Sequence, residues 1–284
     1  MNRTRPMSSF RPSLTVSTVA LLLLGTATAC GGVAVGSSSK SGLEAAKKRG
    51  TLLVANTQAN PPWNFVDESD KPAGYDVDVA YEVARRLGIG KVKFVQADYK
   101  SFIPGVQSGR YDIVISGQTI TEERKKQVGF SRSYQVNGIA VFVAAKNTSI
   151  RSAADLRGRR IAVTAGTTEE QWVRANVPKA KLKTLQNATL SLTDVSLGRE
   201  DASLVSKFQG SHLAGKNNLN AKPVGPLLET EITGMSFAKT DTAMKGAVDK
   251  AIGNMLADGT LSRISVKWLN GLDITTELRK LPAR

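Results

Sequence analysis

Apolar and polar positions along the first half of the chain follow two different spacings. Short apolar runs are typical of buried strands, and stretches with apolar residues every three or four positions are typical of helices that bury one face. The two kinds of segment alternate. The predicted elements are a helix over 43–49, strands over 51–56, 91–96 and 113–115, and helices over 75–87 and near 101–107. This alternation predicts an α/β fold with a parallel, doubly wound sheet.

The same alternation restarts after an apolar strand over 138–146, which we expect to cross into a second lobe. Residues 210–225 are polar and predict a loop. The other predicted elements of this half are strands over 160–164, 182–185, 201–205 and 231–239, and helices over 188–197, 242–256 and 260–269.

Residues 1–29 have the layout of a secretory signal peptide: three arginines, an apolar stretch and then small residues. Cys30 follows directly and is the only cysteine in the sequence, so the chain has no internal disulfide. The small residues before Cys30 resemble a lipobox, with Ala27 in place of the commoner Leu. We expect Cys30 to be the lipidated N-terminus of the mature protein and residues 30–42 to form a flexible tether.

The sequence of 284 residues carries a net charge of +15, which becomes +12 once the three arginines of residues 1–29 are removed. Its Lys and Arg residues are scattered and form no basic recognition helix or aromatic-interleaved patch. We therefore expect no nucleic-acid partner. The bland explanation of the positive charge is that it attracts the protein to anionic lipid or cell wall.

The stretch from Ser116 to Arg124 runs from a predicted strand through a small polar turn into a helix start. Thr121 is typical of an N-cap, and Arg124 stands where a capping box has Glu or Gln. A cation there opposes the helix dipole. Beside the backbone N–H groups of Gly117 and Thr119, its guanidinium suits a carboxylate ligand. The alternative is a surface ion pair with Glu122, Glu123 or Asp112.

A second helix start follows the strand over 160–164. Thr167 and Glu170 have capping-box spacing, so the N–H groups near Thr168 either face a ligand or serve the cap alone. The single histidine, His212, has no Cys/His cluster around it. A metal site is therefore not expected. We also expect no cofactor and no hydrolytic triad, because no G-x-S-x-G turn or phosphate-binding loop is present.

The order of short motifs over residues 43–272 resembles the bacterial extracellular solute-binding proteins of family 3, the polar amino-acid type linked to ABC transporters. The motifs are Gly74-Tyr75-Asp76-Val77-Asp78, Ile103-Pro104, Gly109-Arg110-Tyr111-Asp112, Thr119-Ile120-Thr121 with Arg124, Phe130-Ser131, Asp155-Leu156-Arg157-Gly158, Ala165-Gly166-Thr167-Thr168, Gly198-Arg199-Glu200-Asp201-Ala202 and Asp258-Gly259-Thr260 with Lys267-Trp268. Each is weak alone, and their joint order is strong.

This resemblance implies a two-lobed, periplasmic-binding-protein-like fold of type II, with two hinge strands and the ligand held in the cleft. On that basis the first lobe comprises residues 43–140 and 233–284, and the second comprises residues 141–232.

The resemblance also implies the site. Arg124 matches the residue that clamps the ligand's α-carboxylate, with Gly117 and Thr119 as partners. The other implied ligand-binding positions are Tyr99, Thr167, Thr168, Asn60, Trp63 and Ser206. Asn60 replaces a stacking aromatic residue, for which Trp63 either compensates or is simply core.

Ser206 falls where an acid usually meets the ligand's α-ammonium. We therefore expect a ligand without that group, a ligand with alkylated nitrogen, or another acid in the site. Candidates for that acid are Glu169, Glu170 and Asp194.

The expected function is a lipid-anchored, extracytoplasmic, monomeric receptor that captures a small carboxylate-bearing polar solute, an amino acid or close relative, for an ABC permease. One rival is a cyclohexadienyl-dehydratase-like enzyme on the same fold, disfavoured because the predicted pocket lacks His and an evident acid. The other rival is a sensory lipoprotein.

Overall fold

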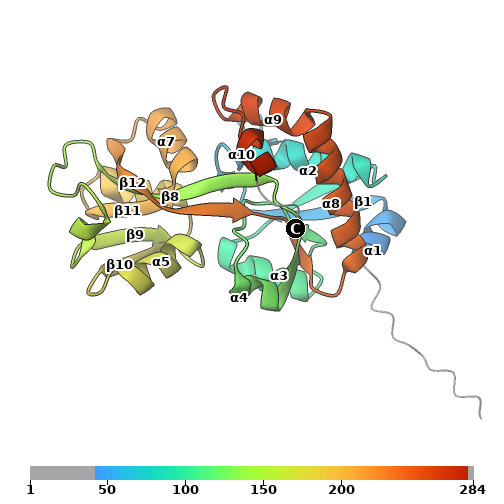
Figure 1. Ribbon diagram of the computed structural model, residues 1–284, viewed down its shortest axis with the longest axis horizontal. Coiled ribbons are helices and arrows are strands. Elements are labelled where there is room, and N and C mark those ends of the chain that lie inside the picture. Colours follow the sequence, from blue (N-terminus) through green and yellow to red (C-terminus); the bar gives the residue numbers. More distant parts are fainter. Residues whose placement is uncertain (1–41, 281–284) are drawn as a thin grey trace, which may run out of the picture. The chain divides into compact units, whose positions relative to one another are not determined.

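The computed structural model describes residues 42–280, which form two lobes, each built on a five-stranded sheet (Figure 1). The first sheet has the order β5-β1-β6-β13-β7. Its strands are β1 (Thr51–Asn56), β5 (Lys91–Gln96), β6 (Ile113–Val114), β7 (Val128–Phe130) and β13 (Ser236–Ala238). Strands β5 and β6 run parallel to β1, whereas β13 is antiparallel to β6 and β7.

The second sheet has the order β10-β9-β11-β8-β12. Its strands are β8 (Gln135–Ala144), β9 (Arg160–Thr164), β10 (Lys181–Leu185), β11 (Ala202–Ser206) and β12 (Ala221–Thr233). Strands β9, β10 and β11 are parallel, and β8 is antiparallel to β11 and β12. The predicted parallel sheet is therefore found with one exception in each lobe, because β13 in the first sheet and β8 in the second run opposite to the other strands.

Strands β8 and β12 are the hinge strands, and they run side by side from one lobe to the other (Figure 1). They pair from Gln135 and Thr233 at one end to Ala144 and Ala221 at the other. Tyr134, just before β8, lies in the core of the first lobe, while Val141 lies in the core of the second. A small change in these two strands therefore reorients the lobes.

Both sheets are covered on both faces, as the alternation of side chains along their strands dictates. In β1, Leu52 and Val54 belong to one apolar core and Ala55 to another. In β8, Val141 and Phe142 likewise enter different cores.

Helices of the first lobe are α1 (Gly42–Arg49), α2 (Tyr75–Arg86), α3 (Phe102–Gln107), α4 (Glu122–Gln127), α8 (Thr242–Ala257), α9 (Thr260–Trp268) and α10 (Thr275–Lys280), with a 3-10 turn at Tyr99–Ser101. Those of the second lobe are α5 (Thr168–Asn176), α6 (Ala188–Ser196) and α7 (Lys207–Lys216), with a 3-10 turn at Ala153–Leu156. A three-stranded sheet of β2 (Ala59–Asn60), β3 (Asn64–Val66) and β4 (Pro72–Ala73) adjoins the first lobe.

The polar stretch over 210–225 is not a loop. Helix α7 begins directly after Ser206, and β12 begins at Ala221. A Cβ at Gly210 would lie 2.3 Å from an atom of the Phe142 ring, so the glycine there reflects close packing rather than a turn. His212 consequently lies on a helix, and burial lowers the pKa of its imidazole.

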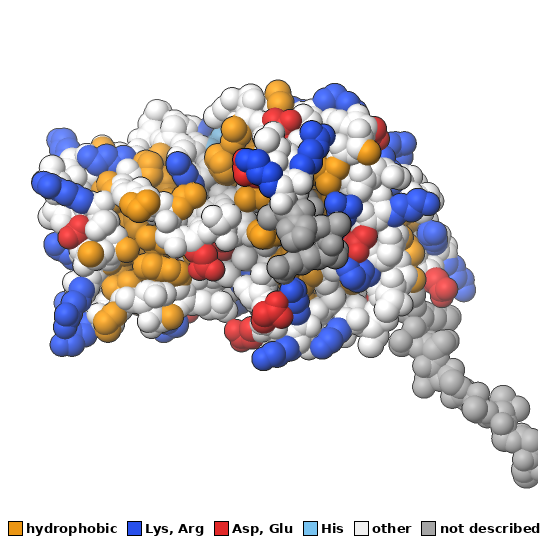
Figure 2. Space-filling model, viewed as in Figure 1, with side chains coloured by type: hydrophobic (Ala, Val, Ile, Leu, Met, Phe, Trp, Pro, Cys, Tyr) orange, Lys and Arg blue, Asp and Glu red, His pale blue; other side chains and the backbone are white. Residues whose placement is uncertain are grey.

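Cys30, the predicted signal peptide and residues 30–41 of the predicted tether lie outside the described residues, whereas Gly42, its last residue, is the first residue of α1. Within residues 42–280, no helix combines the length and apolar character that a membrane span requires. Lys and Arg side chains are spread over the face shown in Figure 2 and do not gather in one patch. That distribution agrees with the expectation drawn from the sequence for this part of the chain.

Candidate functional site

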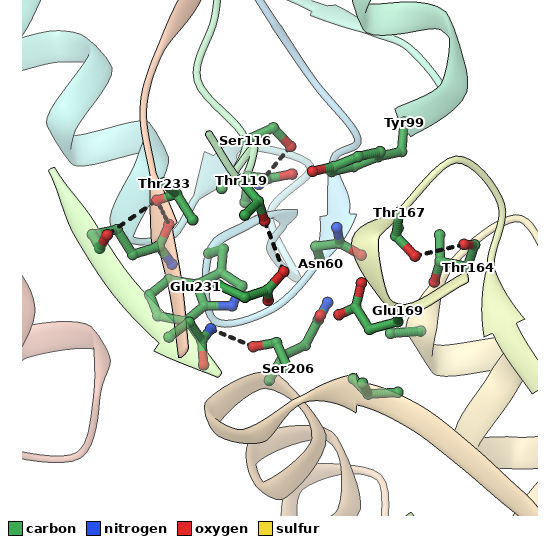
Figure 3. A pocket seen from close by; sticks show the side chains of 18 of the residues that line it. Asn60, Tyr99, Ser116, Thr119, Thr164, Thr167, Glu169, Ser206, Glu231 and Thr233 are labelled. Carbon is green, nitrogen blue, oxygen red and sulfur yellow. Dashed lines mark hydrogen bonds between the residues drawn. The ribbon is translucent and has the colours of Figure 1, made fainter. Parts of the chain in front are cut away.

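A cavity of about 60 Å³ lies between the lobes, where the ends of several strands meet (Figure 3). Its lining comes from both lobes and both hinge strands. The lining residues are Asn60, Trp63, Asn64, Tyr99, Ser116, Gly117, Thr119, Gln135, Asn137, Thr164, Thr167, Glu169, Ala188, Leu204, Val205, Ser206, Gln209, Glu231 and Thr233. Most of these side chains are polar, which suits a small, charged or strongly hydrogen-bonding solute.

Arg124 is buried, with 4% of its surface exposed, and does not itself line the cavity. Its guanidinium donates one hydrogen bond to the carbonyl of Thr119 (2.8 Å) and another to the carbonyl of Gly166 (3.0 Å). Thr119 belongs to the first lobe and Gly166 to the second. The guanidinium carbon also lies 5.5 Å from the ring centroid of Tyr99. Arg124 therefore links the two lobes and lies over an aromatic ring that lines the cavity.

The local sequence explains how Arg124 reaches this place. Thr121 accepts the N–H of Arg124 (3.2 Å), which confirms the predicted N-cap. Asp112, one of the surface partners considered for Arg124, instead binds Arg49 and accepts the N–H of Leu53 (2.8 Å). The misfit of a cation in a first turn thus marks a residue whose side chain leaves the helix surface and becomes buried.

The N–H groups expected to hold a carboxylate are not free. Gly117 donates its N–H to the hydroxyl of Tyr134 (2.9 Å), and the hydroxyl of Tyr99 receives a backbone hydrogen bond from Thr119. Tyr134 in turn donates to Asp76 (2.8 Å), a fully buried carboxyl whose pKa burial raises to about 7. Two tyrosines that the motif does not contain thus occupy both donors in this structure, and the role of Gly117 and Thr119 in holding a ligand stays a prediction.

The turn before α5 forms the opposite wall. Thr167 caps the helix by accepting the N–H of Glu170 (3.3 Å), as predicted, but Glu170 accepts the N–H of Gly166 (2.7 Å) rather than that of Thr167. A Cβ at Gly166 would lie 3.1 Å from Cα of Lys100, so glycine permits this close approach of the lobes. Thr167 lines the cavity, and the Thr168 hydroxyl lies 3.4 Å from that of Thr119.

Ser206 also lines the cavity and is 8% exposed. It lies at the end of β11, and its hydroxyl accepts a hydrogen bond from the Asn137 side chain on hinge strand β8. On the first turn of α7, Gln209 adds a buried Nε2 without a hydrogen-bond partner among the described residues. Ser206 and Gln209 are thus the polar groups that the end of β11 and the start of α7 offer at this wall.

Asn60 and Trp63 reach the cavity from the turn between β2 and β3. Asn60 has a buried Oδ1 without a partner among the described residues, and Figure 3 shows its side chain beside the cavity. Trp63 is both lining and core, since it is 4% exposed and meets the ring of Tyr75 edge-on at 5.6 Å. Neighbouring Asn64 donates to Asp76 (2.7 Å) and Ser116 (3.1 Å), which fixes this wall.

Two acids lie in the cavity: Glu169, one of the three candidates offered by the sequence, and Glu231, which the sequence analysis did not consider. Glu231, on β12, is 5% exposed, and Glu169, on the first turn of α5, lines the same space (Figure 3). Burial, followed by the charge of Glu169, raises the pKa of Glu231 to about 8. Burial likewise raises the pKa of Glu169. Sequence reasoning placed Glu231 in a return strand without a role, since strand alternation alone does not say which face meets the cleft.

The other acids considered from the sequence do not face the cavity. Glu170 pairs with Arg174 (2.7 Å). Asp194 pairs with Lys183 (2.7 Å) and Arg199 (3.2 Å). The sequence-based argument that the pocket lacks an acid is therefore wrong.

Comparison with protein families places this geometry in context. Residues 52–271 match the family model described as bacterial extracellular solute-binding proteins, family 3. The chain belongs to this family. Its relatives include the L-cystine-binding protein TcyJ of Escherichia coli (strain K12), 33% identical over 246 residues, which cover 86% of this chain and 92% of the relative.

Solved structures agree on the fold. An ancestral arginine-binding protein bound to arginine is 38% identical, with a TM-score of 0.74 over 78% of this chain and 98% of its own. An ancestral amino acid-binding protein, described as a precursor of cyclohexadienyl dehydratase, is 34% identical, with a TM-score of 0.76 over 81% of this chain and 100% of its own. The predicted α/β, two-lobed, type II fold with two hinge strands is confirmed.

Proposed function

We propose that this solute-binding protein is a lipid-anchored receptor that captures a small carboxylate-bearing amino acid outside the cytoplasm and delivers it to an ABC permease. The observation that carries the proposal is Arg124, a buried guanidinium that is bonded to one carbonyl of each lobe and lies over the ring of Tyr99, which lines a polar cavity. A ligand carboxylate takes the place of the Gly166 carbonyl on the Arg124 guanidinium and forms a charge-assisted, bidentate pair with it.

Several groups support a ligand that carries opposite charges at its two ends. Arg124 supplies the positive side of the site, and Glu169 and Glu231 supply the negative side. The size of the cavity is also informative: about 60 Å³ holds roughly four to six water-sized groups at 10–15 Å³ each. This favours a small solute, or one for which the lobes open slightly.

Proteins similar in sequence and structure bind amino acids. TcyJ is an L-cystine-binding protein, and the ancestral relative is bound to arginine. We therefore propose an amino acid as the solute class and monomeric action with the transmembrane subunits of an importer. Closure of the lobes excludes water from the ion pair at Arg124 and couples occupancy to docking.

A thermal-shift screen of the purified soluble form, covering the amino acids and glycine betaine, tests this function. At a hundred times its Kd, a specific ligand is expected to raise the free energy of unfolding by about 2.7 kcal/mol. Native mass spectrometry then identifies ligand retained from expression. A screen in which no amino acid raises the melting temperature, with no retained amino acid in the mass spectrum, contradicts the proposal.

The lipid anchor rests on Cys30 and has its own test. Cys30→Ser is expected to release the protein into the medium or to leave the precursor unprocessed, because acylation at that thiol holds the mature chain at the membrane. Detergent partitioning and mass spectrometry of the mature N-terminus check it. An unmodified Cys30 inside a longer mature chain refutes lipidation.

One observation favours the alternative function, a cyclohexadienyl-dehydratase-like enzyme. Glu231 has a raised pKa, and general acid catalysis needs such a group near neutral pH. It is tested by incubating the protein with a cyclohexadienyl substrate and following the absorbance of an aromatic product.

The other alternative, a sensory lipoprotein, differs only in its partner, so genes for a permease and an ATPase beside this one favour transport.

A further inference from the structure

Glu169 and Glu231 approach the cavity from different elements and share one hydroxyl. Thr168 Oγ1 is hydrogen-bonded to Glu231 Oε1 and lies 3.5 Å from Glu169 Oε2. Thr119 Oγ1 donates a second hydrogen bond to Glu231 Oε1 (2.9 Å). Figure 3 shows the Glu169 carboxylate directed into the cavity and the Glu231 carboxylate reaching Thr119. The two carboxyls and two hydroxyls therefore form one cluster, in which Glu231 is buried and the other three side chains are partly buried.

The number of protons in this cluster is limited. Each hydroxyl carries one proton, so Thr119 and Thr168 together satisfy two oxygen–oxygen contacts when both donate to Glu231. The contact between Thr168 and Glu169 then brings two lone pairs together unless Glu169 supplies a proton. One proton held by the carboxyl pair supplies the donor for the contact between Thr168 and Glu169, and only the 3.4 Å contact between the two hydroxyls is then left without a proton. The geometry thus fits a pair of total charge −1.

The charged and titratable groups around the pair lead to the same charge. The positive charge of Arg124 acts on both carboxyls and favours their ionised forms. Tyr99 is the other titratable neighbour, and burial raises its pKa, so its hydroxyl stays neutral. With one proton on the pair, the charges of Arg124 and the pair cancel. With no proton on the pair, the site has a net charge of −1, which is costly away from water.

We propose that Glu231 and Glu169 form the amine-binding end of the cavity and that the pair selects cationic amino acids, because a ligand of net charge +1 replaces the proton that the pair otherwise holds. This inference rests on the proposed function and specifies its substrate class. The ligand carboxylate binds Arg124, and the pair binds the cationic groups. Glu231 on the hinge strand thereby supplies the counter-charge that Ser206 does not.

Charge balance distinguishes two ligand types. A zwitterion adds no net charge, so the pair keeps its proton and the site stays neutral. A ligand such as L-arginine, with one carboxylate and two cationic groups, makes the site neutral only when both carboxyls are ionised. Its binding therefore releases one proton to solvent.

Isothermal titration calorimetry of the wild-type protein tests this exchange with L-arginine and L-glutamine, which share the α-carboxylate and the α-ammonium and differ in the charge of the side chain. Titration at pH 7 in phosphate and in Tris, whose ionisation enthalpies differ, counts the protons. We expect close to one proton released per L-arginine and close to none per L-glutamine. Between pH 6 and 7 the affinity for L-arginine is expected to rise about tenfold, and that for L-glutamine to stay constant.

Glu231→Gln removes the exchangeable charge while keeping the shape of the side chain. We expect at least a tenfold loss of L-arginine affinity, loss of its proton release, and a much smaller change for L-glutamine. Glu169→Gln, on the other lobe, is expected to act in the same direction. Glu229→Gln is the matched control, since Glu229 lies two residues earlier on β12 and is exposed. Thermal melts confirm that each variant is folded.

The outcomes separate the two proposals. If L-arginine binds without proton release, if L-glutamine binds more tightly than L-arginine, or if Glu231→Gln keeps the wild-type pH dependence, the amine-site inference is overturned and the binding function stands. If no amino acid binds the wild-type protein, the proposed function fails, and this inference fails with it.

Discussion

Arg124→Ala is expected to weaken amino-acid binding by about 2–5 kcal/mol, because it leaves the ligand carboxylate buried without its counter-charge. The guanidinium also holds the carbonyls of Thr119 and Gly166, so the substitution removes a bond between the lobes. Titration calorimetry with whichever amino acid emerges from the thermal-shift screen measures the loss.

Two further variants make the result specific. Arg124→Lys keeps the charge and is expected to recover only part of the affinity, since an ammonium cannot donate two parallel bonds to a carboxylate. Lys126→Ala is the control: it removes an exposed cation from the same helix, α4, and is expected to bind like the wild type. Wild-type affinity in Arg124→Ala would show that the carboxylate binds elsewhere.

Much of the fold was predictable because it depends on local patterns. Strand β9 was predicted at its observed bounds, 160–164, since its apolar run ends at turn residues. The unusual position of Arg124 could also be recognised from a local pattern. An Arg at the third helical position breaks a local rule, and such breaks mark side chains that do something other than support their helix.

The remaining errors arise from packing across the chain. Helix α7 looked like a loop because Gly210 and its polar neighbours suit turns, whereas the ring of Phe142, 68 positions earlier in the sequence, requires a residue without a side chain there. Glu231 was missed because its neighbours in space, Thr119 and Thr168, are far from it in sequence. A sequence pattern records neighbours along one element and not across a cleft.

The close packing of α7 gives an expected result of its own. Gly210→Ala is expected to destabilise the protein by about 1–3 kcal/mol, because an added Cβ would lie 2.3 Å from an atom of the Phe142 ring, which is fully buried. Either the ring moves or α7 lifts from the sheet. Since Ser206 and Gln209 lie at the start of α7, lifting the helix would also disturb the cavity wall.

The sign of this effect is what tests the explanation. Glycine is a poor helix former, and Gly→Ala within a helix ordinarily stabilises it by roughly 0.5–1 kcal/mol. Gly215 lies in the same helix with open space around its Cβ position, so Gly215→Ala is expected to follow that ordinary rule. Urea unfolding of both variants beside the wild type measures the difference. If Gly210→Ala is as stable as Gly215→Ala, then contact with Phe142 does not hold α7 against the sheet, and the small residue at position 210 has another cause.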